Sequence, residues 1–226
     1  MALTRTTPSL DLAADPAVVA AWVTGWTLSR GTPPPVPFDG GLRVDVGLPV
    51  QRARYVLPRF EPKRLHGLAA SLSLPWTFLK VCAPPDIVAQ ALPEGWAVQA
   101  PVFMMTASLT RRDGSTEPPR GYAVHLSHDG AVISATLRDS LGELAASGCM
   151  ALTESHAVFD RIETDAAHRR RGLGSVVMTV LSQEAAARGV DAAVLVATQD
   201  GHGLYSALGW DLHSPVTSCV VPGDVA

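Results

Sequence analysis

The apolar and polar positions of this chain predict four helices. In the first, Val18, Trp22 and Trp26 recur four residues apart, which places their side chains on one stripe of a helix that faces a core. Asp15 and Pro16 precede them, as an N-cap and a first helical residue do. The predicted helices are this segment, which ends near Gly31, and residues 62–73, 84–92 and 173–187.

Between the helices, short segments rich in apolar and β-branched residues predict strands. The predicted strands are residues 42–46, 76–82, 96–109, 122–126, 131–137, 143–152, 157–164 and 192–197. The proline-rich segment 32–37 is expected to be an extended linker or surface loop. After residue 120, polar turns separate the strands at short intervals, which predicts an antiparallel meander that leads into a strand–helix–strand unit.

A polar segment rich in proline and glycine, residues 111–120, is the best boundary within the chain. Before it, helices and strands alternate, which is typical of an α/β unit. Gly95-Trp96 faintly resembles Gly209-Trp210. We therefore divide the chain into an N-terminal α/β region, residues 1–110, and a core, residues 111–226, and one interpretation of the first region is a degenerate half-copy of the second. Residues up to Ala14 are expected to be poorly ordered.

Composition is that of a globular protein. The chain has 226 residues, of which 47% are hydrophobic and 17% charged, enough for one large domain or two small ones. No apolar run approaches the length of a membrane span, and the N-terminus lacks the pattern of a secretory signal. Cys82, Cys149 and Cys219 are odd in number and lack metal-type spacing, so we expect reduced, mostly buried thiols, no metal, and a cytoplasmic protein.

The distribution of charge disfavours nucleic acid as a partner. The net charge is −3; residues 1–105 carry 9 basic and 7 acidic side chains, and the remainder 9 and 14. Arg169, Arg170 and Arg171 therefore form a basic spot in an acidic half. Such a spot suits an anionic cofactor beside an amine substrate, and ordinary surface charge explains the acidic excess equally well.

The arginines begin the most informative motif, Arg169-Arg170-Arg171-Gly172-Leu173-Gly174-Ser175, which lies between a predicted strand and a predicted helix. The first N–H groups of a helix lack internal partners and carry partial positive charge. Glycines allow close approach of a ligand, so the motif predicts a phosphate or pyrophosphate site, with a solvated basic surface as the alternative. It is neither a Walker loop nor a dinucleotide fingerprint.

This motif and a second one resemble the signatures of the GNAT superfamily of acyl-CoA-dependent N-acetyltransferases. The family's Gln/Arg-x-x-Gly-x-Gly/Ala is matched by Arg169, Gly172 and Gly174, and its Leu-Tyr-x-x-x-Gly-aromatic run by residues 204–210. The resemblance covers residues 121–221. It implies an α/β fold with a mixed, mostly antiparallel central sheet flanked by helices, to which this chain adds its N-terminal α/β region. The family's two helices between its first two strands have no room within residues 122–137, so the N-terminal region is expected to replace them or they are lost.

The resemblance implies acetyl-CoA as co-substrate. Its diphosphate would lie on the N–H groups of residues 171–175, with Arg169 and Arg171 as side-chain partners and Arg170 turned to solvent or to the ribose phosphate. Its pantetheine arm would pair with the strand at 162–164, where a backbone N–H polarises the thioester. The family often has an Asn where this chain has Thr198. The cofactor-binding residues are predicted to be Ile162, Glu163, Thr164, Arg169, Arg170, Arg171, Gly172, Leu173, Gly174, Ser175 and Thr198.

Two predicted catalytic residues follow from the resemblance. Tyr205 is placed as the general acid that protonates the leaving thiolate; the alternative is a Tyr packed in the core. Asp160 is favoured as the base, and a salt-bridged Asp160 is the alternative. Three residues beyond it, Glu163 is expected to point to the opposite face of a regular strand and to be structural rather than catalytic. His156 and His202 are the fallback bases.

The predicted function is transfer of an acetyl group to a primary amine of a small molecule. The enzymatic alternatives are another acyl donor or a protein N-terminus as acceptor, and the non-enzymatic one is a regulatory protein that binds acyl-CoA. A small-molecule amine and a second copy in a homodimer are the expected partners, without nucleic acid or membrane.

Overall fold

The computed structural model describes residues 14–109 and 116–224. Its helices are α1 Pro16–Arg30, α2 Pro62–Ser71, α3 Pro85–Ala91, α4 Leu173–Ala187 and α5 Gln199–Ala207, with a 3₁₀ turn at Ala166–His168. Its strands are β1 Val36–Phe38, β2 Gly41–Leu48, β3 Gln51–Leu57, β4 Thr77–Val81, β5 Ala97–Val98, β6 Val102–Ser108, β7 Tyr122–Asp129, β8 Val132–Asp139, β9 Leu144–Leu152, β10 Ala157–Thr164, β11 Ala192–Ala197 and β12 Asp211–Val220.

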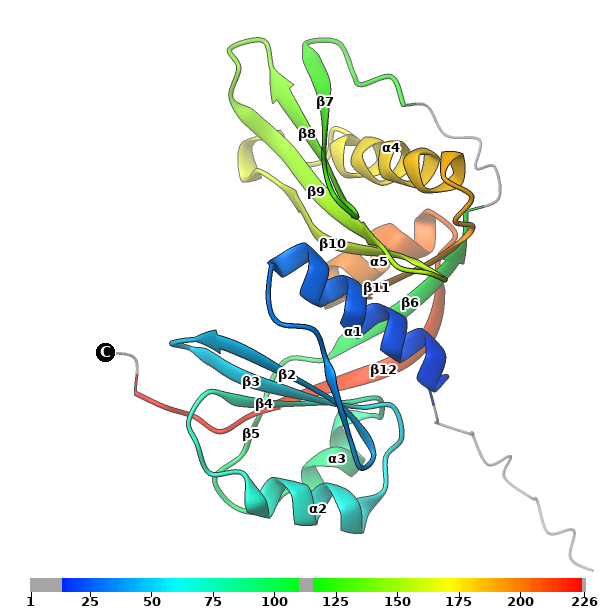
Figure 1. Ribbon diagram of the computed structural model, residues 1–226. Coiled ribbons are helices and arrows are strands. Elements are labelled where there is room, and N and C mark those ends of the chain that lie inside the picture. The colour runs from blue at the N-terminus through cyan, green and yellow to red at the C-terminus, as the bar shows by residue number, and fades with distance from the viewer. Residues whose placement is uncertain (1–13, 110–115, 225–226) are drawn as a thin grey trace, which may run out of the picture.

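The strands form one sheet that runs through both parts of the molecule (Figure 1). Its order is β1-β2-β3-β4-β12-β6-β11-β10-β9-β8-β7, with β5 beside β12. Two neighbouring pairs are parallel, β3 with β4 and β10 with β11, and each pair is connected through a helix. All other pairs are antiparallel. From either end of the sheet, antiparallel strands therefore come first and one parallel pair follows, so the pattern of strand directions is nearly symmetrical.

Strands β6 and β12 lie at the middle of this sheet and join its two ends. β12 pairs with β6 through residues 211–216 and with β4 through residues 217–220. β6 pairs with β11 along its other edge. Since β6 precedes the predicted boundary and β12 follows it, each half of the chain contributes a strand that closes the sheet of the other.

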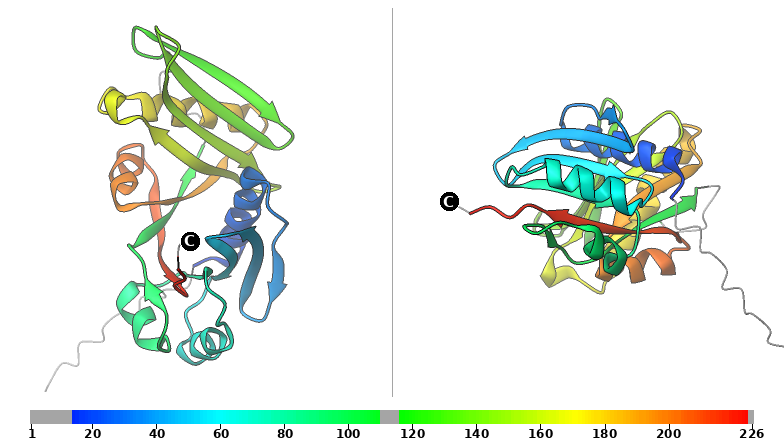
Figure 2. Two further views of the ribbon diagram at one scale, coloured as in Figure 1. Left: turned by 90° about the vertical axis from the view of Figure 1, so that its left-hand side faces the viewer. Right: turned by 90° about the horizontal axis from the view of Figure 1, so that it is seen from below.

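Helix α1 covers one face of the C-terminal half of the sheet. Its Trp22 and Trp26 are 5% exposed and pack in a cluster with Val158 of β10 and Val194 of β11. Helix α4 covers the other face, where Phe159 belongs to a separate cluster. Figure 2 shows the two helices on opposite sides of these strands. The N-terminal region thus supplies a helix for the face that residues 122–137 leave without one.

The cap of α1 is as predicted, because the Asp15 side chain accepts from the N–H of Ala17 at 2.8 Å and Gly31 ends the helix with φ 60°. A smaller cluster under α2 and α3 holds the N-terminal half of the sheet. The three cysteines are free and buried, which confirms the expected thiols.

The fold class is confirmed, but the predictions for residues 32–37 and 96–109 need correction, and β3, α5 and β12 were not expected from the sequence. Strand β3 was not expected, because polar residues at 51, 52 and 54 interrupt its apolar residues and its buried positions do not alternate. The strand expected at 96–109 is two strands, β5 and β6, and the linker at 32–37 runs into β1. The prediction for residues up to 13 and the centre of the boundary, residues 110–115, lie outside the described residues.

Candidate active site

The site begins where two parallel strands separate. β10 and β11 are in register only at Ala157–Ala193 and Val158–Val194, although each strand continues for several residues and stays paired with its other neighbour. Beyond Val158 the two facing edges diverge and leave backbone N–H and C=O groups without a strand partner. A cavity of about 800 Å³ occupies the opening, within the range of small-molecule sites.

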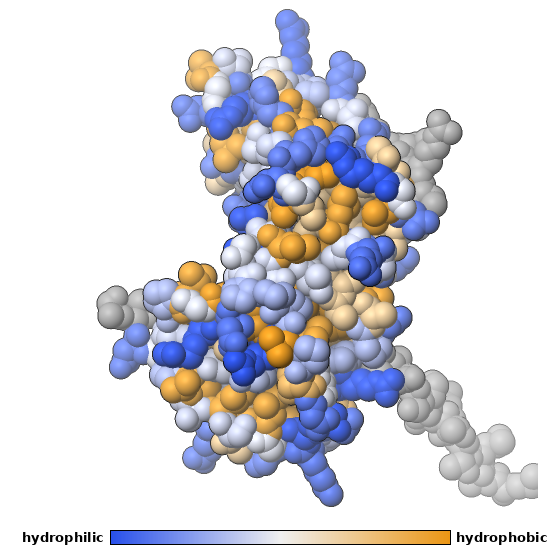
Figure 3. Space-filling view, viewed as in Figure 1, coloured by the Kyte–Doolittle hydropathy of each residue, from blue (hydrophilic) through white to orange (hydrophobic). Residues whose placement is uncertain are grey.

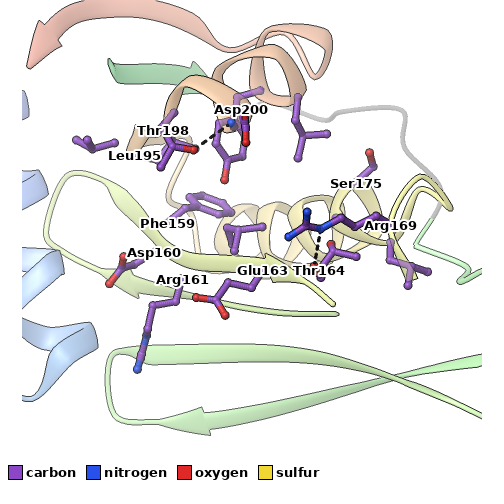
Figure 4. Close-up of a pocket in the computed structure, with 18 of the residues that line it drawn as sticks. Phe159, Asp160, Arg161, Glu163, Thr164, Arg169, Ser175, Leu195, Thr198 and Asp200 are labelled. Carbon is purple, nitrogen blue, oxygen red and sulfur yellow. Dashed lines mark hydrogen bonds between the residues drawn. The ribbon is translucent and has the colours of Figure 1, made fainter. Parts of the chain in front are cut away.

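The cavity brings together residues from four elements. Figure 4 shows β10 below it, the start of α4 at one end, and the start of α5 across from β10. The lining residues are Phe159–Thr164, Arg169, Arg170, Gly172–Ser175, Leu195–Thr198, Asp200, Gly201, Leu204 and Tyr205. Every predicted site residue lines it except Arg171.

The start of α4 has the features of an anion site. Gly172 is the N-cap residue with φ 77°, and no side chain caps the helix, so the first N–H groups are free to bind a ligand. An added Cβ on Gly174 would lie 3.5 Å from Leu204 and from Thr164. Since such a Cβ would make ordinary van der Waals contact, an alanine would also fit here, and the start of α4 lies close to both walls of the cavity.

The three arginines of the motif point in different directions. Arg169 and Arg170 line the cavity, and the Nε of Arg169 donates to the carbonyl oxygen of Thr164 at 3.4 Å. Arg171 instead donates to the hydroxyl of Tyr122 at 2.7 Å and to the carbonyl oxygen of Ala167 at 3.1 Å. Arg171 therefore braces the loop, whereas Arg170 faces the cavity.

A β-bulge in β10 sets the directions of its acidic side chains. Asp160 pairs with Cys149 and Glu163 with Ser147, so β10 has one residue more than β9 here, and Arg161 takes φ 54°. The extra residue reverses the alternation of side chains. Asp160, Arg161 and Glu163 therefore lie on one side of β10, away from Phe159 (Figure 4). The expectation that Asp160 and Glu163 face opposite sides was wrong, because it assumed a regular strand.

Asp160 is an ion-pair partner in this structure. Its two carboxylate oxygens accept from Arg30 of α1 at 2.7 and 3.0 Å, and from the hydroxyl of Ser29 at 2.9 Å. Burial alone would raise the pKa of Asp160, but hydrogen bonding and charge from Arg30, with help from Ser29, bring it below its ordinary value. This geometry matches the alternative in which Asp160 forms a salt bridge instead of acting as the base. A carboxylate held by an ion pair is a weak proton acceptor.

Tyr205 lies in the cavity wall with its ring 6.1 Å from that of Trp210. Burial, and then the negative charge of Asp160, raise the pKa of Tyr205 to about 12. The phenol therefore keeps its proton at neutral pH and is a donor. Thr198 caps α5 by accepting from the N–H of Gly201 at 3.2 Å, which leaves its own hydroxyl proton free to donate.

The remaining candidate bases differ in position. Glu163 is exposed and lines the cavity. His156 lies in the turn before β10 and bonds to Ser155, and His202 packs on Phe103; neither histidine lines the cavity. Within residues 14–109 and 116–224, no group of three His, Cys, Asp or Glu side chains is arranged to hold a metal, and no helix there has the length and apolar character to cross a membrane.

Ser29 and Arg30 are site residues that sequence reasoning missed. They lie at the end of α1, more than a hundred residues before Asp160. No motif marks them, and only the packing of α1 on β10 brings them to Asp160, which lines the cavity. A basic residue such as Arg30 in the last turn of a helix is common and does not by itself indicate a functional site.

Comparisons with known proteins bear on the fold. Residues 136–219 match the model of the family described as FR47-like protein. A GCN5-related N-acetyltransferase from Kribbella flavida is similar with a TM-score of 0.65 and 14% identity over 91% of this chain and 96% of that one. A GNAT-family structure from Novosphingobium aromaticivorans gives 0.57 and 19%, over 93% and 100%.

A further similar structure is a tandem GNAT protein from the clavulanic acid biosynthesis pathway, with a TM-score of 0.53 and 15% identity over 76% of each chain. No curated protein matches the chain. At these identities the solved structures establish the fold, and the fold that the resemblance implies is confirmed.

Proposed function

We propose that this chain, which has the fold of the GNAT superfamily, is an N-acetyltransferase that transfers the acetyl group of acetyl-CoA to a primary amine of a small molecule. The observation that carries the proposal is the opening between β10 and β11, which joins an uncapped helix start to a protonated tyrosine in one cavity. Acetyl-CoA supplies the activated thioester in such a reaction.

The residues present fit a CoA-type donor. The free N–H groups at the start of α4, with Arg169 and Arg170 beside them, suit a diphosphate. The unpaired edge of β10 at residues 162–164 suits the amides of a pantetheine arm, because such an edge binds an extended chain through backbone hydrogen bonds. Leu173, Gly174 and Ser175 provide the helix-start donors, and Thr198 offers a hydroxyl from the opposite wall.

In the proposed reaction Tyr205 is the general acid. Its raised pKa keeps the proton in place until a thiolate, which is a stronger base than a thiol, leaves beside it. Glu163, rather than the ion-paired Asp160, is then the better acceptor for the amine's proton, since it is a carboxylate in the cavity with no ion pair among the described residues. Asp160 keeps Arg30 and the end of α1 in place.

We also propose that residues 1–110 are a degenerate GNAT-like half. The parallel pair β3–β4 joined through α2 corresponds in topology to β10–β11 joined through α4. The near-symmetrical strand order and the Gly-Trp pairs at 95–96 and 209–210 support the same relation. The similarity to a tandem GNAT protein is consistent with it.

Thiol release from acetyl-CoA over a panel of small amines tests the function. The wild-type chain should turn over at least one amine, and Tyr205→Phe should lower kcat roughly 100-fold or more with CoA affinity unchanged. Tyr55→Phe, which removes a hydroxyl from β3 of the other half, is the matched control and should be neutral. Equal rates for Tyr205→Phe and wild type would remove the general-acid role.

The same panel separates the alternative functions. Turnover only with a longer acyl-CoA, or only with peptide N-termini, would replace the donor or the acceptor of the proposal. CoA binding without turnover of any donor and acceptor pair would favour a regulatory protein.

A further inference from the structure

A reciprocal contact joins the last turn of α1 to the β-bulge of β10. Arg30 and the hydroxyl of Ser29 donate to the carboxylate of Asp160. In the opposite direction, Nη2 of Arg161 donates to the carbonyl oxygen of Ser29 at 2.6 Å. The carbonyl groups of a last helical turn have no partner within the helix, so Arg161 binds one that α1 leaves open. Each segment therefore donates to the other.

The backbone of Arg161 needs this support. Arg161 takes φ 54°, a left-handed conformation that is unfavourable for a residue with a Cβ and that persists only where the surroundings hold it. Besides its bond to Ser29, Nη2 of Arg161 donates to Sγ of Cys149 in β9 at 3.4 Å. The same Sγ donates to the carbonyl oxygen of Asp160 at 3.4 Å. The bulge is thus tied to α1 and to β9 at the residue where the backbone turns.

Gly148 of β9 shapes the bulge from the other face of the sheet. It lies opposite the extra residue of β10. An added Cβ on Gly148 would overlap Cδ1 of Ile162 and lie 2.8 Å from Cγ1 of Val177 in α4. The side chain of Ile162 therefore packs towards α4 in the space that the glycine leaves, while Arg161 turns to α1. The bulge is held from both faces of the sheet.

The bulge sets the geometry of the cavity wall that follows it. Residues 162–164 line the cavity with a backbone edge that β11 does not pair. Glu163 lies on the same side of β10 as Asp160 only because of the extra residue (Figure 4). A rotation of the backbone at Arg161 would therefore turn both the N–H of Ile162 and the carboxylate of Glu163. Misplacement of reacting groups by about 1 Å can cost a reaction roughly 100-fold.

Helix α1 connects this bulge to the N-terminal region. It packs in one cluster with Val158 of β10 and with Val44 of β2 and Val56 of β3. Gly25 lets its backbone lie close to β10, since an added Cβ would overlap the side chain of Val158. The molecule is indented between the part built on β7–β10 and the part built on β1–β5 (Figure 3), and α1 crosses the join between them (Figure 1). The position of β10 thus depends on both parts.

We propose that Arg161 is a positioning residue for acyl transfer. By binding the end of α1 it fixes the bulge, and with it the edge at residues 162–164 that receives the donor and the direction of the Glu163 carboxylate. The N-terminal region then contributes to the reaction through α1 rather than through a residue in contact with the donor. This inference rests on the proposed function, whose geometry it specifies.

The experiment replaces Arg161 by glycine, which adopts φ 54° without strain but cannot bind Ser29. In the amine panel, Arg161→Gly should lower kcat roughly 10- to 100-fold. The Kd for acetyl-CoA should change less than about threefold, because the anion site at the start of α4 is unaltered. The Tm should change by less than about 4 °C, since relief of backbone strain offsets the lost hydrogen bond.

Two further variants identify the cause of the loss. Arg161→Lys keeps a donor on a long side chain and should restore kcat to within about fivefold of wild type. Arg188→Gly is the matched control, because Arg188 donates to the carbonyl oxygen of Glu184 near the end of α4 at 2.8 Å and does not line the cavity. Its kcat should equal that of wild type. An equal loss of kcat in Arg161→Lys and Arg161→Gly would overturn the role of the bond to Ser29.

An infrared spectrum of bound acetyl-CoA, isotope-labelled at the thioester carbonyl, supplies a readout that does not need turnover. A hydrogen bond from the edge of β10 would lower the carbonyl stretching frequency, because it polarises the carbonyl. Wild type should show this shift, and Arg161→Gly should lose about half of it or more. If Arg161→Gly lowers the Tm but keeps the kcat and the carbonyl frequency of wild type, Arg161 is a structural contact only and the inference is overturned.

The two proposals fail in different ways. If no amine is acetylated, the acetyltransferase proposal falls, and a carbonyl shift that wild type shows and Arg161→Gly lacks would keep the positioning role. Without that difference both proposals fall. If amines are acetylated and Arg161→Gly matches wild type in kcat, the function stands and the inference falls.

Discussion

The two parallel strand pairs of the sheet have the same topology and opposite consequences. β3 and β4 stay in register from Ala53–Thr77 to Leu57–Val81, and the N–H of Cys82 extends the pairing to the carbonyl oxygen of Leu57 at 3.0 Å. β10 and β11 lose their register after two residue pairs. The first pair has no slot for an extended ligand, and the second has one.

The helix starts differ in the same sense. α2 begins with Pro62 after Glu61, which makes no side-chain cap. A proline lacks the N–H that an anion would need, and a glutamate repels one. α4 begins with Gly172 and Leu173 after three arginines. A βαβ unit can hold an extended anionic ligand in this way only when its strands separate and its helix start offers free N–H groups, and the strands of the N-terminal unit stay paired.

The largest expected effect comes from closing the helix start of α4. Gly172→Glu places a side chain at φ 77° and a carboxylate where the diphosphate would lie. We expect CoA affinity to fall roughly 100-fold by calorimetry. Gly67→Glu is the control, since Gly67 lies in α2 with open space beside it, and CoA affinity should not change. Unchanged affinity in the Gly172 variant would place the diphosphate elsewhere.

A smaller effect separates the arginines of the motif. Arg169→Ala should weaken CoA binding roughly tenfold, and the loss should shrink as salt is added. Arg171→Ala should change CoA binding less, because Arg171 is engaged with Tyr122 and Ala167, and should lower the Tm instead. If Arg171→Ala weakened CoA binding more than Arg169→Ala did, Arg171 would be the diphosphate partner that the sequence predicts.

The smallest effect concerns the contact between the halves, the ion pair of Arg30 with Asp160. The pKa of Asp160 is lowered in the folded state, so its stabilisation is present above the ordinary pKa near 3.8 and is lost as the pH falls through the folded-state value. Asp160→Asn should reduce the free energy of unfolding by about 1 kcal/mol at pH 7. The deficit should close in acid.

The surface pair Arg43–Asp45, which lies within one half, is the control for this prediction. Asp45→Asn should change the free energy of unfolding little, because the side chains of Arg43 and Asp45 are both largely solvated. Denaturation curves at pH 7 and pH 3 measure both variants. A deficit for Asp160→Asn that persists at pH 3 would show a steric rather than an electrostatic origin.

The sequence predicts the C-terminal unit better than the N-terminal one for physical reasons. β10, α4 and β11 have the predicted bounds because turn residues separate their apolar and β-branched residues from the neighbouring segments, although a bulge interrupts β10. β3 was missed because Arg54 occupies a buried position where an apolar residue is expected.

The parts of the site that local sequence does not encode come from long-range packing. The direction of Glu163 depends on a bulge defined by the register with β9. The ion-paired state of Asp160 depends on α1, whose Arg30 is 130 residues away along the chain. The motif residues Arg169, Gly172 and Gly174 could be identified because they lie within six residues of one another, and all three line the cavity.

Strand β12 has a consequence for biosynthesis. It follows every other described strand along the chain, yet it fills the place between β4 and β6. Until residues 211–220 have left the ribosome, both neighbours expose unpaired backbone edges, which are prone to join other chains. Neither half can complete its sheet without β12, so a chain shortened before Asp211 would be expected to aggregate rather than to yield a smaller folded unit.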